Sequence, residues 1–165
     1  MDGTARGRLL AVAAGAALAL TACAQASAQT QPAPVGGPVP ATLSVTLGAA
    51  PSFGSFQAGV ARDYTASTTA TVTSSAGNAA LIVQDTSPFY TNHLVNGTFA
   101  LSQELQVKNN DGNYQTMPAG LRFWGGPTAN ESVPVQLKQS ITATEPLRTG
   151  AYSKSLTFTL STTAP

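Results

Sequence analysis

Alternation of apolar and polar residues is the most regular feature of this chain. Near its end, Leu156, Phe158 and Leu160 alternate with serine and threonine. A β-strand turns successive side chains to opposite faces, so this spacing predicts a strand whose apolar side chains enter a core. The same alternation predicts that Leu43, Val45 and Leu47, and later Val133, Val135, Leu137, Gln139 and Ile141, face the core from strands of their own.

Further short segments have the β-branched and aromatic content of strands, namely 64–73, 79–83, 98–101, 105–108 and 121–124. Turn-forming sequences such as Asn96-Gly97 and the run from Asn109 to Asn113 separate them. No segment after position 40 shows the periodicity of an amphipathic helix. The pattern predicts an all-β fold, an antiparallel immunoglobulin-like β-sandwich of about eight strands. A jelly roll or small barrel is the alternative.

The beginning of the chain follows a different pattern. Arg6 and Arg8 precede an uncharged run, rich in alanine and leucine, from Leu9 to Leu20, and small residues follow. This is the layout of an export signal. The apolar run is too short for a transmembrane helix, which needs about 20 residues. We therefore expect a signal peptide over 1–22 and an exported protein.

Two cleavage sites fit this signal. The sequence Leu20-Thr21-Ala22-Cys23 resembles the lipobox of bacterial lipoproteins, which implies cleavage before Cys23, a lipid on its thiol and a membrane-anchored protein. The alternative is cleavage after Ala28 by ordinary signal peptidase, which gives a soluble secreted form. The uncharged, proline-containing stretch 23–40 predicts an extended linker, and 41–165 the folded domain.

Charge excludes one class of partner. After position 22, lysine and arginine balance aspartate and glutamate, and the charged residues are scattered singly. Proteins that bind nucleic acid need clustered basic residues for the phosphates. We expect no nucleic-acid partner.

The last nineteen positions, 147–165, contain the turn Gly150-Ala151-Tyr152, a strand with Phe158-Thr159-Leu160, and a terminal proline. This order resembles the end of WxL-type bacterial surface domains, which close with Gly-x-Tyr, a strand carrying Trp-x-Leu, and a proline. The earlier Trp-x-Leu of that family would fall near Leu81-Ile82-Val83, and the tryptophan of both motifs is absent here. The resemblance implies an extracellular module that associates non-covalently with the cell wall.

We expect structural roles for the residues of this ending, namely Gly150, Tyr152, Leu156, Phe158 and Leu160. In immunoglobulin-like domains a tyrosine at a strand entry often turns its ring inward and returns its hydroxyl to the backbone of the preceding loop. Tyr152 stands at such a position, so we expect this hydrogen bond.

Patterns for catalysis or metal binding are lacking. His93 is the only histidine, and no serine lies in Gly-x-Ser-x-Gly. The oxygen-rich run from Asn109 to Asn113 lacks the late glutamate of an EF-hand and is interpreted as a hairpin tip. We expect no enzymatic activity, no metal and no other cofactor.

Two aromatic pairs, Phe89-Tyr90 and Phe123-Trp124, are candidate ligand-binding residues. Neighbours on a strand point to opposite faces, so one member of the second pair is expected in the core. Core filling is the alternative role of Trp124.

The leading hypothesis is a non-catalytic exported cell-envelope or surface domain with a structural or adhesive role. Its expected partners are cell-wall polymer or another surface protein, and the membrane if Cys23 carries a lipid. One alternative is a pilus-like assembly subunit that exchanges its last strand with a neighbour. Another is a carbohydrate-binding accessory module.

Overall fold

The computed structural model describes residues 34–162, in which all regular secondary structure is β-strand. The strands are β1 (Leu43–Leu47), β2 (Arg62–Ser74), β3 (Ala79–Gln84), β4 (Val95–Asn96), β5 (Phe99–Ala100), β6 (Gln106–Lys108), β7 (Tyr114–Thr116), β8 (Ala119–Trp124), β9 (Thr128–Ile141) and β10 (Thr157–Ser161). Every pairing between them is antiparallel. The prediction of an all-β fold built from antiparallel strands is confirmed.

The chain divides after Gly36, and all the strands belong to the unit Gly37–Pro165. The described part of the chain contains no helix that could cross a membrane. The predicted signal peptide, Cys23 and the first part of the linker lie outside the described residues.

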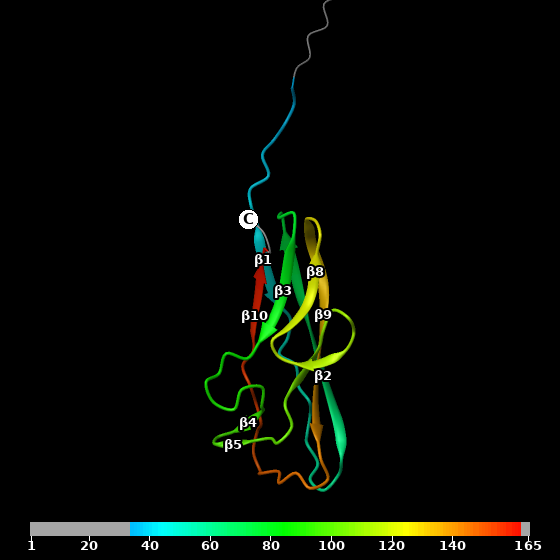
Figure 1. Ribbon diagram of the computed structural model, residues 1–165, viewed down its shortest axis with the longest axis vertical. Helices are drawn as coiled ribbons and strands as arrows, with labels where there is room; N and C mark the ends of the chain where they lie inside the picture. The colour runs from blue at the N-terminus through cyan, green and yellow to red at the C-terminus, as the bar shows by residue number, and fades with distance from the viewer. Residues whose placement is uncertain (1–33, 163–165) are drawn as a thin grey trace, which may run out of the picture. The chain divides into compact units, whose positions relative to one another are not determined.

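Two sheets face one core. The larger has the order β1-β2-β9-β6-β7 and the smaller β10-β3-β8, while β4 and β5 form a separate hairpin. The long strands β2 and β9, of 13 and 14 residues, extend beyond the smaller sheet (Figure 1). There the irregular segment between β3 and β6 adds Leu94, Leu101 and Leu105 to the core.

The core follows the predicted alternation on the central strands. All five predicted side chains of β9 are buried: Val133, Val135, Leu137, Gln139 and Ile141. They meet Leu81 and Val83 of β3, which are 0% exposed. Burying each such aliphatic side chain contributes about 1.5 to 3 kcal/mol. The period-two pattern thus places these side chains correctly.

The pattern fails at the edge strand β1. Leu43 and Leu47 are 47% and 46% exposed, so the prediction that both enter the core is wrong. The cause is position, because β1 ends its sheet and only β10, at the edge of the smaller sheet, approaches it from the other layer. Only Val45 is partly buried against the core. Leu156, Phe158 and Leu160, near and on the edge strand β10, are partly buried and pack against the core, so the face predicted for them is correct.

Residues 34–162 form ten strands where about eight were predicted. The additional strands are β4 and β7, of two and three residues. Each completes a hairpin whose other strand was predicted, β5 and β6 respectively. The turn between β6 and β7 is the predicted hairpin tip, in which Asn109 Oδ1 accepts the N–H groups of Asp111 and Asn113.

Candidate functional site

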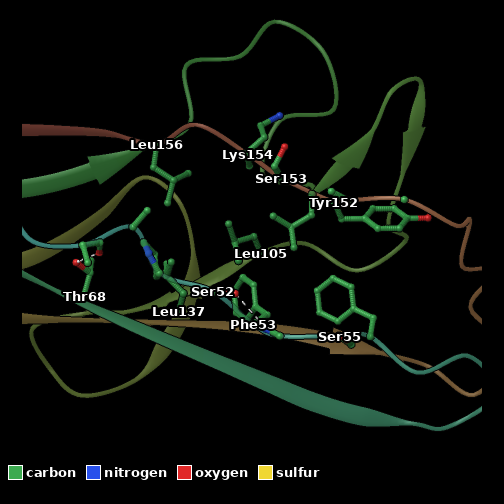
Figure 2. Close-up of a pocket in the computed structure, with 18 of the residues that line it drawn as sticks. Ser52, Phe53, Ser55, Thr68, Leu105, Leu137, Tyr152, Ser153, Lys154 and Leu156 are labelled. Atoms are coloured by element: carbon green, nitrogen blue, oxygen red, sulfur yellow. Dashed lines mark hydrogen bonds between the residues drawn. The ribbon is translucent and has the colours of Figure 1, made fainter.

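A cavity of about 930 Å³ opens at the edges of the two sheets, beside β1 and β10 (Figure 2). We call it the edge cleft. Residues 48–58, which follow β1, and residues 147–156, which precede β10, supply most of its lining. Leu94, Leu105 and Leu137 also line it, although they are core residues with exposures of 2 to 4%. The cleft therefore reaches the hydrophobic core, and its volume is within the usual range for ligand pockets.

Aromatic contacts join the two segments that line the edge cleft. The ring of Phe56 meets that of Tyr64 edge-on at 4.9 Å and that of Tyr152 at 6.2 Å, both measured between centroids. The Tyr64 hydroxyl accepts a hydrogen bond from the Gln57 N–H at 2.9 Å. Residues 48–58 are thereby held against β2, and residues 147–156 contact the same aromatic ring, Phe56, through Tyr152.

Tyr152 has the predicted geometry. Its ring packs against the core, and its hydroxyl accepts a hydrogen bond from the Arg148 N–H at 2.8 Å. Gly150 has a φ of 132°, and a Cβ there would lie 2.6 Å from Nδ2 of Asn96. Only glycine fits this turn without a shift of its neighbours. These contacts give Gly150 and Tyr152 a structural part in shaping the cleft.

The lining of the edge cleft is more apolar than polar and contains few charged residues. Among the lining residues only Arg148 and Lys154 are charged. The Arg148 guanidinium lies over the ring of Phe99, at 5.5 Å from its centroid. The ammonium group of Lys154 points away from Leu105 and Phe53 in Figure 2. The arrangement suits an uncharged, largely apolar ligand.

Lys154 forms a buried ion pair with Asp85, 69 positions earlier in the chain. Its Nζ lies 3.0 Å from Asp85 Oδ2, and the two side chains are 4% and 0% exposed. The same ammonium donates to the carbonyl oxygens of Tyr90 at 2.7 Å and Phe89 at 3.2 Å. The Asp85 carboxylate also accepts the N–H groups of Ser87 and Asn92. Both charges are thus paired and hydrogen-bonded, as buried charges require.

Hydrogen bonding determines the charge state of Asp85. Burial of the carboxyl raises its pKa, but the hydrogen bonds from Ser87, Asn92 and Lys154 outweigh burial and lower the pKa to about 2. The carboxylate therefore stays charged in the folded protein well into the acid range. It holds the loop 85–92 against the segment that leads into β10.

That loop exposes the first candidate aromatic pair. Phe89 is 77% and Tyr90 50% exposed. Tyr90 and Asn92 have φ angles of 50° and 64°, in the left-handed region that is uncommon for residues with side chains. Such backbone persists only where surrounding contacts hold it, here the contacts of Asp85 and Lys154.

The second candidate pair divides between surface and core, as expected of neighbours on a strand. Phe123 is 55% exposed and Trp124 9% exposed. Trp124 Nε1 donates to Glu131 Oε2 at 2.6 Å, and this carboxylate also accepts from Thr128 Oγ1 and Arg122 Nε. The hydrogen bond from Trp124 is the largest of the causes that lower the pKa of Glu131. Trp124 thus fills the core and joins the β8–β9 hairpin.

The two aromatic pairs lie at opposite ends of β3. Phe123 and Trp124 pair with Ala80 and Ala79 at its beginning, whereas Phe89 and Tyr90 follow its last residue. The structure does not combine them into one surface. Neither pair lines the edge cleft. Gly150, Tyr152, Leu156 and Phe158 do line it, although the sequence predicted only structural roles for them.

The remaining polar candidates have local partners. His93 Nδ1 lies 2.7 Å from the carbonyl oxygen of Leu101, and its Nε2 lies 3.9 Å from Glu104. Within residues 34–162 no three side chains of His, Cys, Asp or Glu are grouped as metal ligands.

No family model matches the chain, and searches of curated proteins and of solved structures found no match. The resemblance to WxL-type domains stays a prediction.

Proposed function

We propose that this protein is a non-catalytic, exported cell-envelope or surface domain with an immunoglobulin-like β-sandwich fold, and that it holds a partner protein in the edge cleft. Its role is structural or adhesive. Export rests on the signal pattern at 1–22, and anchoring on the lipobox at Cys23. The observation that carries the proposal is the 930 Å³ cleft, which opens directly onto core leucines.

An extended, apolar polypeptide segment suits this cleft better than a charged wall polymer. The lining supplies leucine and phenylalanine side chains, neutral hydroxyl groups and no carboxylate. Its two cations already have partners, since Lys154 pairs with Asp85 and Arg148 lies over Phe99. The cleft also adjoins β10, the edge strand of the smaller sheet, where a peptide strand can add main-chain hydrogen bonds.

The alternatives place binding elsewhere. In the strand-exchange alternative the last strand is donated to a neighbour, and deletion of 153–165 would abolish assembly. The structure pairs that strand, β10, with β3 of its own chain. In the carbohydrate-binding alternative the exposed rings of Phe89 and Tyr90 stack on sugars, which their 77% and 50% exposures favour.

Blocking the edge cleft is expected to abolish adhesion. Ser55 is an exposed residue of the cleft lining, and Ser55→Trp places a bulky ring where the partner segment would lie. The matched control is Ser67→Trp, at an exposed position of β2 outside the cleft. The measurement is binding of purified, processed protein to bacteria that lack its gene, and to purified sacculi.

We expect wild type and Ser67→Trp to bind cells, protease treatment of the cells to remove this binding, and Ser55→Trp to lose at least tenfold in affinity. Equal binding by Ser55→Trp and wild type would contradict the role of the cleft. Retention by sacculi alone, lost in a Phe89→Ala, Tyr90→Ala double variant, would instead support the carbohydrate-binding alternative.

A further inference from the structure

The edges of the two sheets differ in how they are protected against pairing. On one side of the domain, β7 has only three residues, and β8 carries a bulge at Leu121 and the charged Arg122. Short strands, bulges and charges are the usual devices that keep an edge from pairing with another chain. On the opposite side, β1 is a regular five-residue strand, Leu-Ser-Val-Thr-Leu, with none of them. β10 of the smaller sheet approaches β1 without pairing with it, so β1 has no hydrogen-bonded partner among the described strands on the side away from β2.

The hydrogen bonds to β2 show which backbone groups of β1 face that edge. The Ser75 N–H donates to the carbonyl of Thr42, and the Gly48 N–H donates to that of Thr69. Hydrogen-bonded pairs alternate with non-hydrogen-bonded pairs in an antiparallel ladder, so the even positions of β1 bond to β2. The N–H and C=O groups of Leu43, Val45 and Leu47 therefore point away from β2, where no described strand pairs with them.

We propose that β1 pairs with β1 of a second copy of this chain, antiparallel about a two-fold axis at Val45. In this register Val45 lies opposite Val45 of the second copy, and Leu43 lies opposite its Leu47. Each of these positions has its N–H and C=O directed outward, so every such pair forms both of its hydrogen bonds. The two large sheets become one continuous sheet.

The side chains are complementary in the same register. The exposed leucines, 47% and 46% accessible, meet each other across the axis, and the hydroxyl residues Ser44 and Thr46 meet on the other face. Charge does not oppose the contact, because residues 34–61 contain no Asp, Glu, Lys or Arg. A self-complementary patch is what a two-fold dimer requires. The pairing does not depend on the edge cleft having a ligand.

The strand pair is small beside the roughly 1,200 Å² of a standard interface, so we expect a reversible dimer that dissociates on dilution. Sedimentation equilibrium of the processed protein, from micromolar to millimolar concentration, measures it. Leu43→Lys with Leu47→Lys places lysine opposite lysine and is expected to give a monomer. Leu43→Lys with Leu47→Glu places opposite charges across the axis and is expected to dimerise at least tenfold more tightly than the double-lysine variant.

Two further variants separate pairing from folding. Leu43→Pro removes an outward N–H and leaves the bonds to β2 intact, so it is expected to fold and to be monomeric. Thr71→Lys, on the exposed face of β2, and Ser55→Trp in the cleft are both expected to dimerise as wild type does. A wild type that stays monomeric throughout, a double-lysine variant that dimerises as wild type does, or equally weak association of the two charge variants would each overturn the proposal.

Discussion

Replacing Asp85 with alanine is expected to lower the free energy of unfolding by about 3 to 5 kcal/mol, the usual cost of breaking a buried ion pair. The variant leaves the Lys154 ammonium, which is 4% exposed, without its counter-charge. Only the carbonyl oxygens of Phe89 and Tyr90 still accept its hydrogen bonds. Denaturant-induced unfolding, followed by the fluorescence of Trp124, measures the loss.

The matched control is Asp63→Ala. Asp63 lies 3.8 Å from Lys138 and is 58% exposed, and an ion pair of that kind contributes less than about 1 kcal/mol. The double variant Asp85→Asn, Lys154→Met removes both charges and is expected to lose less stability than the two single variants together. A loss in Asp85→Ala no larger than that in Asp63→Ala would show that the buried pair does not stabilise the fold.

The same carboxyl gives the stability a defined dependence on pH. Its pKa falls from an ordinary 3.8 to about 2 on folding, so the unfolded chain takes up the proton first as pH decreases. The ionised Asp85 carboxylate therefore contributes about 2 kcal/mol to the free energy of unfolding. This contribution is complete above about pH 5 and is lost as pH falls through 2. Wild type is expected to lose this much more stability than Asp85→Asn between pH 5 and pH 2.

Trp124→Ala is expected to cost about 3 to 5 kcal/mol, the range for removing a large aromatic side chain from a core. Trp124 is 9% exposed, and its Nε1 donates to Glu131 at 2.6 Å. The variant therefore creates a cavity and also removes a hydrogen bond that joins β8 to β9. Thermal unfolding by circular dichroism measures the loss, because Trp124 is the only tryptophan.

Phe123→Ala is the control for this substitution. Phe123 is adjacent on β8 but 55% exposed, so its removal is expected to cost less than about 1 kcal/mol. Equal losses in the two variants would contradict the assignment of Trp124 to the core and Phe123 to the surface.

The alternation of apolar and polar residues was enough to predict the buried face of the central strands. On β9 every second residue from Val133 to Ile141 is buried. Residues of the smaller sheet and of the segment between β3 and β6 belong to the same core and cover this face of the strand. The same pattern misled at β1, because alternation shows which side chains share a face and not whether another layer covers that face. Leu43 and Leu47 are exposed for this reason.

The features that define the candidate site depend on contacts between distant residues. Asp85 and Lys154 lie on segments that are brought together by the β3–β10 pairing and by the bridge between Val95 and Ser153. No sequence feature near either residue predicts that the other is its partner. The edge cleft likewise forms between two irregular segments, 48–58 and 147–156, and neither sequence has the regular pattern that predicts how a strand or helix is buried. The Tyr152 hydrogen bond could be predicted, since its partner Arg148 is four positions away.

We propose that this domain functions outside the cytoplasm as an exported surface module. The most direct test is the mass of the N-terminal peptide of the protein isolated from fractionated cells. The account predicts an envelope or secreted protein that begins at Cys23 with a lipid attached, or at Gln29 if ordinary signal peptidase cleaves. A cytosolic protein that retains residues 1–22 would contradict it.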